Sequence, residues 1–161
     1  MAPVGQFAYR GIPMMQREEV CHVFPELLEE YLPARILEIG SGFGGLSLLL
    51  RHALNEQGRA DVPILSIDVL PRPPHEEVRA AGVDLQIYNP FSPDYLVVDS
   101  RVEEFIAGPG PTLVLCDGGN KPAEFAALAR LLKHGDAILA HDYAPDRDYF
   151  HRHMENKTWN W

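Results

Sequence analysis

The feature that most constrains the fold of this chain is a series of five short aliphatic runs. They are RILEI (35–39), PILSID (63–68), VDLQIY (83–88), TLVLCD (112–117) and DAILAHD (136–142). Continuous apolar runs of this length are typical of parallel strands that are covered on both faces. Stretches with helical periodicity separate most of these runs, at 45–58, 74–82 and 121–135. This alternation predicts an α/β fold with a doubly wound, mostly parallel sheet.

The length of 161 residues is enough for a single domain with one sizeable core. We expect an entry segment and helix over 1–33, a core over 34–145 and a tail over 146–161. The entry helix is expected to break or bend near Pro25. The segment 89–111 has no clear pattern, and its part YLVVDSRVEEFIAG is compatible with a strand that passes into a helix or with one helix throughout. We favour mostly helix.

The formal net charge of −9 argues against a nucleic-acid or membrane partner, because such surfaces attract basic proteins. The N-terminus lacks the apolar run of a signal peptide, and no apolar stretch is long enough to span a bilayer. Cys21 and Cys116 are far apart in sequence, which fits a reducing, cytoplasmic setting. We therefore expect a small-molecule substrate as the partner, with a homodimer as an open alternative to a monomer.

A glycine-rich loop, EIGSGFGG (38–45), joins the first core strand to its helix. Gly40, Gly42 and Gly44 allow a tight turn and a close approach of the backbone to a ligand. The helix that follows directs its free N–H groups at that ligand. The run fits both G-x-G-x-G and the dinucleotide fingerprint G-x-G-x-x-G, so the loop alone does not identify the cofactor.

Two acidic residues flank this loop. Glu38 lies just inside it, and Asp68 ends the second strand, where a carboxylate can accept hydrogen bonds from ribose hydroxyls. An acid at the second position suits NAD equally well, so the later strands must distinguish the two cofactors.

Further polar residues follow the fourth and fifth strands, in CDGGNK (116–121) and AHDY (140–143). Because the carboxyl ends of parallel strands meet at one edge, Asp117, His141 and Asp142 are expected beside the glycine loop. Oxygen and imidazole ligands suit Mg²⁺ or Mn²⁺, and such an ion can activate a substrate hydroxyl. The alternative is that Asp117 caps a helix and Asp142 starts a turn. Lys121 is a candidate base if desolvated, and otherwise a solvated lysine at a helix start.

Together these segments resemble the class I methyltransferases, and within them the cephalosporin hydroxylase and rhamnosyl O-methyltransferase group. The resemblance covers most of residues 9–145. Its motifs are YRGIPM, ARILEIGSGFGG, LSIDV, LCDGGNKPAEF and KHGDAILAHDYA. It implies a Rossmann-like fold that binds S-adenosylmethionine (SAM). The group's fold continues into an antiparallel strand pair that closes the sheet; this sequence stops at Trp161, so we expect either a shortened chain or a minimal member lacking that pair.

The resemblance also implies roles for individual residues. The methionine part of SAM would contact Gly40, Ser41, Gly42 and Gly44, with Glu38 in the group's acidic position. Asp68 would bind the ribose, and Asn89 or, in another register, Asp99 would lie near the adenine. Asp117, His141 and Asp142 would correspond to the group's metal site. The chain departs from the group at His141, where an acid is usual, and at Asn120, where a histidine is usual.

These observations predict a SAM-dependent methyltransferase that acts on an oxygen of a small hydroxylated molecule, with or without help from a metal. Asp117, His141 and Lys121 are the candidate catalytic residues, and Asp117 also borders the cofactor. Two alternatives stay open: a non-catalytic SAM-binding module of a larger assembly, and an NAD-dependent oxidoreductase.

Overall fold

The computed structural model describes residues 7–140 and contains a five-stranded parallel sheet. The strand order is β5-β4-β3-β6-β7. The strand bounds are Arg35–Ile39 (β3), Ile64–Asp68 (β4), Asp84–Ile87 (β5), Thr112–Cys116 (β6) and Ala137–Ala140 (β7). The first core strand, β3, lies in the centre, and the order reverses between β3 and β6. The predicted doubly wound α/β fold is confirmed, and this reversal is where such sheets open a crevice.

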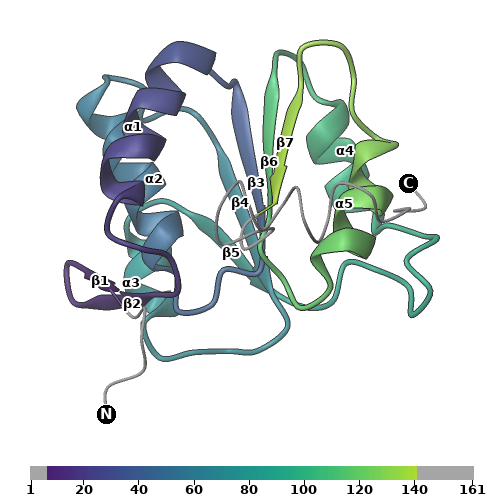
Figure 1. Ribbon diagram of the computed structural model, residues 1–161, viewed down its shortest axis with the longest axis horizontal. Coiled ribbons are helices and arrows are strands. Elements are labelled where there is room, and N and C mark those ends of the chain that lie inside the picture. Colours follow the sequence, from purple (N-terminus) through teal and green to yellow (C-terminus); the bar gives the residue numbers. More distant parts are fainter. Residues whose placement is uncertain (1–6, 141–161) are drawn as a thin grey trace, which may run out of the picture.

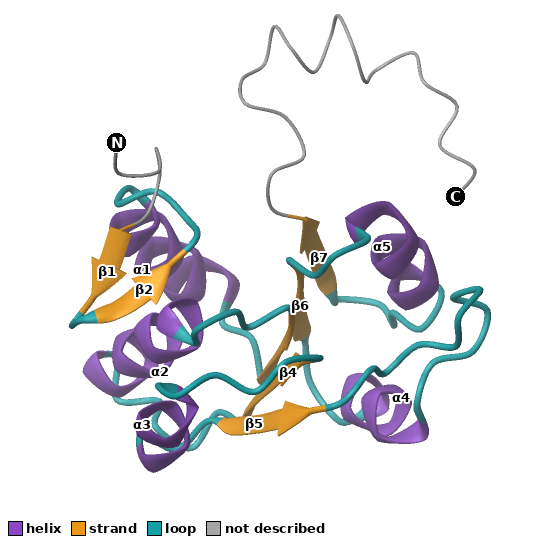
Figure 2. Cartoon of the chain, turned by 90° about the horizontal axis from the view of Figure 1, so that it is seen from below, coloured by secondary structure: helices purple, strands orange, loops and turns teal. Residues whose placement is uncertain are grey.

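Helices cover both faces of the sheet (Figure 1). Their bounds are Val20–Tyr31 (α1), Gly45–Glu56 (α2), His75–Ala80 (α3), Ser100–Ala107 (α4) and Lys121–Ala129 (α5). Figure 2 shows α1, α2 and α3 on one side of the strands and α4 and α5 on the other. None of the helices within residues 7–140 is both long and apolar enough to cross a membrane.

The strands alternate their side chains between two apolar layers. In β3, Ile36 packs with the α1–α2 layer, whereas Leu37 packs with the α4–α5 layer. Leu113 and Val114 of β6 divide in the same way. All four side chains are fully buried. This double coverage explains why the strands are continuous apolar runs in the sequence.

The entry segment forms more structure than the predicted helix alone. It begins with an antiparallel hairpin of β1 (Phe7–Tyr9) and β2 (Ile12–Met14), turned at Arg10 and Gly11. Helix α1 follows and continues through Pro25, so the expected break there does not occur. The hairpin lies beside the sheet on the α2 side (Figure 2).

Within 89–111, the part YLVVDSRVEEFIAG is mostly helix, as expected, but the helix occupies only Ser100–Ala107. Helix α4 begins after Asp99, whose carboxylate accepts the Arg101 N–H and so caps the helix. The preceding residues form a loop that is closed by an isolated bridge between Phe91 and Val98. Asp94 accepts the Leu96 N–H within this loop. These local turn contacts compete with helical hydrogen bonds, as short polar side chains commonly do.

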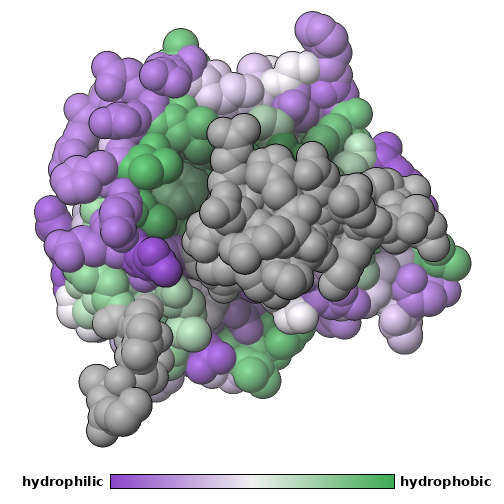
Figure 3. Space-filling model, in the orientation of Figure 1, coloured by the Kyte–Doolittle hydropathy of each residue, from purple (hydrophilic) through white to green (hydrophobic). Residues whose placement is uncertain are grey.

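The surface seen from the side of Figure 1 is mixed (Figure 3). Hydrophilic residues dominate its left edge, and hydrophobic surface gathers nearer the middle. Among residues 7–140, large apolar side chains that are more than half exposed include Met15, Val69 and Leu70. All three line the cavity described below.

Candidate active site at the carboxyl edge of the sheet

The strand register brings three predicted site residues to one edge of the sheet. Ile39 of β3 pairs with Ile67 of β4 and with Cys116 of β6. The residues that follow these three are Gly40, Asp68 and Asp117. The glycine loop and two of the predicted acids therefore share the carboxyl edge, as expected.

Gly40 allows the loops after β3 and β6 to touch. Its φ is +87°, a conformation that favours glycine, and a Cβ here would lie 2.4 Å from the backbone carbonyl of Asp117. The Asp117 N–H donates to Ile39 O at 2.8 Å, and the Gly40 N–H donates to Ile67 O at 2.8 Å. A side chain at Gly40 would push these loops apart.

Asp68 is fixed against the glycine loop. Its Oδ2 accepts the Gly42 N–H at 2.7 Å and its Oδ1 accepts the Leu70 N–H at 2.9 Å. On the other side of the loop, His75 Nε2 lies 2.8 Å from Gly42 O. The loop is thus anchored from both sides before any ligand binds.

The N-terminal end of α2 lies at the same edge and carries a partial positive charge, which neither an N-cap side chain nor an acidic residue of the first turn offsets. Its N-cap is Gly44, with no side-chain hydrogen bond, and its first turn contains no acidic residue. Ser41 lies beside this turn, only 6% exposed, and within the described chain its Oγ has no hydrogen-bond partner. A buried unsatisfied hydroxyl costs about 1–3 kcal/mol, which a ligand could recover.

A cavity of about 430 Å³ opens between these elements. It is a size that suits small-molecule and cofactor sites. Its wall also includes Lys121 and six of the predicted cofactor residues, namely Gly40, Ser41, Gly42, Asp68, Asn89 and Asp117. Tyr88 and Tyr95 line the side formed by β5 and the loop after it.

Side chains from two distant parts of the chain contact Asp117. Gln16, from the segment after the hairpin, donates from Nε2 to Asp117 Oδ2 at 2.5 Å. Lys121 Nζ lies 3.3 Å from Asp117 Oδ1 and 3.3 Å from Gly118 O. The Asp117 side chain is 9% exposed, so this is an enclosed ion pair rather than a solvated one.

Two predicted cofactor residues lie off the cavity wall. Glu38 is 1% exposed, and its carboxylate accepts hydrogen bonds from Ser47 of α2 and Ser66 of β4. Burial, with added repulsion from Asp117 and Asp68, raises the pKa of Glu38 to about 7 despite those bonds. Gly44 instead packs on α3, where a Cβ would come 2.6 Å from Val78 Cγ2.

Only one ligand of the predicted metal site, Asp117, lies among the described residues, since His141 and Asp142 lie outside them. Asp117 already accepts from an amide and pairs with an ammonium, and a second cation beside Lys121 would be repelled. Nowhere in residues 7–140 do three histidine, cysteine, aspartate or glutamate side chains gather closely enough to hold a metal ion.

Sequence reasoning missed the contribution of the entry segment to the cavity. Residues 13–16 line it, and Gln16 reaches Asp117 across 101 positions of sequence. Sequence reasoning also missed Arg72, whose guanidinium lies 4.5 Å from the centre of the Phe43 ring at the cavity wall. For the entry segment, the available signal was the G-x-P motif in YRGIPM, but this motif does not indicate which residues the segment contacts.

The parallel sheet, its order reversal and the glycine-loop cavity define a Rossmann-like domain of the class I methyltransferase type. The family model described as Rhamnosyl O-methyltransferase/CmcI matches residues 3–160, nearly the whole chain. The chain therefore belongs to this family.

Solved structures agree on the fold. The apo structure of CmcI-N160 superposes with a TM-score of 0.65 at 21% identity, covering 93% of this chain and 61% of that one. CmcI-N160 with SAH gives a TM-score of 0.60 at 17% identity, covering 94% of this chain and 78% of that one. The chain thus spans about three fifths of the length of the first of these. No curated protein matches the sequence.

Proposed function

We propose that this chain binds SAM in the carboxyl-edge cavity and transfers its methyl group to a hydroxyl oxygen of a small molecule. The observation that carries the proposal is unused hydrogen-bonding capacity at one place. Ser41, the start of α2 and Asp68 line the same cavity; within the described chain the Ser41 hydroxyl has no hydrogen-bond partner, and the start of α2 has no side-chain cap. Family membership supports a methyltransferase in general terms.

The residues of the cavity wall suggest where the methionine part, the ribose and the adenine of the cofactor would lie. The carboxylate of its methionine part suits the α2 N-terminus and Ser41, because helix N-termini favour anions. The ribose hydroxyls suit the remaining lone pairs of Asp68. The adenine suits the end of β5 near Asn89, where Val69 and Leu70 offer exposed apolar surface at 59% and 54% exposure.

The transfer itself requires mainly alignment of the acceptor oxygen with the methyl carbon. The acceptor oxygen forms the new bond as the carbon–sulfur bond breaks and its electron pair stays on sulfur. Asp117 lies on the cavity wall and is the residue we assign to accept the hydroxyl proton. His141, the second candidate base, lies outside the described residues, and no step is assigned to it or to a metal.

A thermal-shift panel tests the cofactor assignment. S-adenosylhomocysteine (SAH), the product cofactor, should raise the melting temperature with increasing concentration, and NAD should not, because a ligand stabilises only the state that binds it. Stabilisation by NAD instead would favour the oxidoreductase alternative. No shift with either compound would refute the proposal.

A panel of hydroxylated acceptors then tests the reaction, with formation of SAH from SAM as the readout. Binding of SAH without transfer to any acceptor would favour a non-catalytic SAM-binding module. We further propose that the protein works in the cytoplasm on small molecules. Sedimentation of the purified protein tests whether it forms a homodimer.

A further inference from the structure

We propose that Lys121 supplies, as a fixed ammonium, the positive charge that a divalent ion would otherwise provide beside Asp117. The site would then transfer a methyl group without a metal. This inference rests on the proposed function, because it concerns the acceptor side of the same cavity.

Asp117 is already engaged by two donors. Each of its two oxygens already faces a donor, Gln16 Nε2 on one side and Lys121 Nζ on the other. Gln16 is 4% exposed, and the Asp117 side chain is 9% exposed. Hydrogen bonds that are enclosed in this way are stronger than those at the surface. A metal would have to displace the ammonium or lie against it.

Lys121 is held in place by the start of α5 and the loop before it. It is the first residue of α5, capped by the Asn120 side chain, which accepts the Ala123 N–H. The loop before it is fixed by Glu124, whose carboxylate accepts the N–H groups of Gly118 at 3.1 Å and Asn120 at 3.0 Å. A Cβ on Gly118 would lie 2.3 Å from Glu124 Oε1, so the loop fits closely against that carboxylate.

Gln16 acts as a positioning residue for Asp117. Its neighbour Met14 is 2% exposed and packs on Gly45 at the start of α2. A Cβ on Gly45 would lie 2.2 Å from Met14 Cγ. The hairpin therefore packs on α2, and this contact places Gln16 next to Asp117 at the end of β6. Asp117 is thus oriented by elements from both ends of the described chain.

The chemistry balances with these groups alone. As the acceptor oxygen bonds to the methyl carbon, the carbon–sulfur bond breaks and the sulfonium becomes the neutral thioether of SAH. The hydroxyl proton passes to the carboxylate of Asp117 and then to water. Lys121 stays protonated throughout. Its charge stabilises the negative charge that develops on the acceptor oxygen, which is the part that a Lewis acid would otherwise play.

The test begins with the metal alone. Mn²⁺ is titrated into the wild-type protein saturated with SAH, and free Mn²⁺ is followed by electron paramagnetic resonance. We expect no saturable binding that depends on Asp117, with Asp117→Asn as the matched control. We expect Lys121→Met to bind Mn²⁺ more tightly than the wild type, because it removes the competing charge. Tight binding to the wild type that is lost in Asp117→Asn would overturn the inference.

Turnover gives a second, independent readout. Removal of metal with EDTA should change wild-type transfer by less than about twofold. Lys121→Met should lower kcat by about 100-fold while SAH affinity stays close to that of the wild type, and Lys121→Arg should retain much of the activity. Loss of wild-type transfer in EDTA, restored by Mn²⁺, would contradict the inference and leave the proposed function intact. Absence of SAH binding would instead refute the proposed function, and this inference with it.

Discussion

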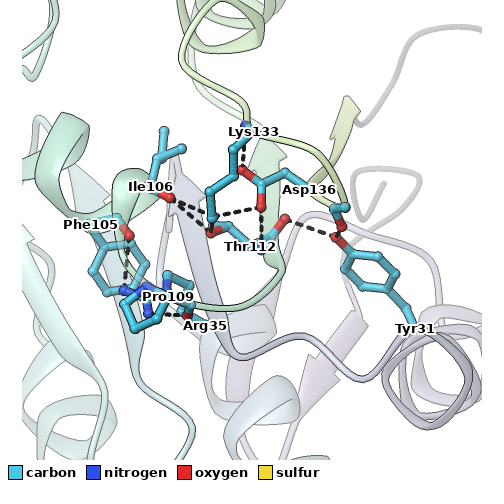
Figure 4. A network of polar contacts seen from close by, with 9 residues as sticks. Tyr31, Arg35, Phe105, Ile106, Pro109, Thr112, Lys133 and Asp136 are labelled. Carbon is cyan, nitrogen blue, oxygen red and sulfur yellow. Dashed lines mark hydrogen bonds and ion pairs between the residues drawn. The ribbon is translucent and has the colours of Figure 1, made fainter.

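Two lysine–aspartate pairs lie at opposite edges of the sheet, and they differ in how fully their donors are used. At the amino edge, Lys133 Nζ donates to Ile106 O at 2.8 Å, to Thr112 Oγ1 at 3.1 Å and to Asp136 Oδ1 at 2.8 Å (Figure 4). All three protons of this ammonium have partners. At the carboxyl edge, and among residues 7–140, Lys121 Nζ has two polar contacts, with Asp117 Oδ1 and with Gly118 O, both at 3.3 Å.

The two aspartates also differ in their surroundings. Asp136 accepts the backbone N–H groups of Thr112 and Lys133 in addition to the ammonium, and Tyr31 closes the network from α1 (Figure 4). Asp117 is joined to other side chains and borders a cavity. The amino-edge pair joins β6, β7 and α4 into one body, whereas Asp117 and Lys121 of the carboxyl-edge pair line the cavity. Position at the cavity wall distinguishes the carboxyl-edge pair from the structural pair at the amino edge.

The largest effect should come from Asp117→Asn. An amide cannot accept the acceptor's proton, so we expect turnover to fall by about 1,000-fold. SAH affinity and thermal stability should stay near those of the wild type, since Lys121 can keep the remaining side-chain oxygen and the Gln16 amide can turn to accept from the new NH2 group. Transfer assays measure turnover, and calorimetry measures SAH affinity and thermal stability. Full activity in the variant would contradict the role of Asp117.

The same chemical change at the other edge, Asp136→Asn, should have the opposite profile. Loss of charge leaves Lys133 with an incomplete set of partners, and we expect the free energy of unfolding to fall by roughly 2 kcal/mol. SAH affinity of the folded protein should not change. Urea unfolding followed by circular dichroism measures the free energy of unfolding. An unchanged midpoint would show that the network contributes little to stability.

Glu38 and Asp136 should respond to pH with opposite signs. The pKa of Glu38 is raised to about 7, so the folded protein gains a proton before the unfolded chain does. Its contribution to stability is complete below the ordinary value of 4.5 and is lost as the pH rises through 7. Although burial opposes it, hydrogen bonds from Lys133 and Thr112 lower the pKa of Asp136, whose contribution is lost on acidification instead.

Glu38→Gln should therefore be stabilised relative to the wild type at pH 8 and lose that advantage at pH 5. The two proteins differ in their free energy of unfolding, and we expect this difference to change by about 1–2 kcal/mol between pH 5 and pH 8. Urea unfolding at both pH values measures it. Parallel pH profiles for the two proteins would show that Glu38 ionises normally inside the fold.

The smallest effect should come from Asp68→Asn. The variant keeps an oxygen for the Gly42 N–H but loses the charge that strengthens a bond to a ribose hydroxyl. We expect SAH to bind about tenfold more weakly. Calorimetric titration measures this, and an unchanged affinity would place the ribose elsewhere in the cavity.

Local patterns in the sequence were sufficient for most of the fold and for half of the site. The run 35–39 matches β3 residue for residue, because a strand buried on both faces leaves a continuous apolar run. Gly40, Asp68 and Asp117 were placed at one edge correctly, since parallel strands align their carboxyl ends. These features depend on neighbours in sequence or on topology alone.

The remaining features depend on contacts between distant residues. Nothing near Gln16 indicates that it meets Asp117, and nothing near Glu38 indicates that two serines enclose it. The sequence did not show where α4 begins within YLVVDSRVEEFIAG, because turn contacts such as the one from the Leu96 N–H to Asp94 do not interrupt the apolar pattern. The roles of His141 and Asp142 stay predictions, since both lie outside the described residues.

The most direct test of the account is a crystal structure of the protein with SAH. We predict the homocysteine carboxylate at the start of α2 within hydrogen-bonding distance of Ser41 Oγ, and the ribose on Asp68. The sulfur should face Asp117 and Lys121 across the cavity. SAH bound at the amino edge near Lys133, or an empty cavity at saturating SAH, would contradict the central claim.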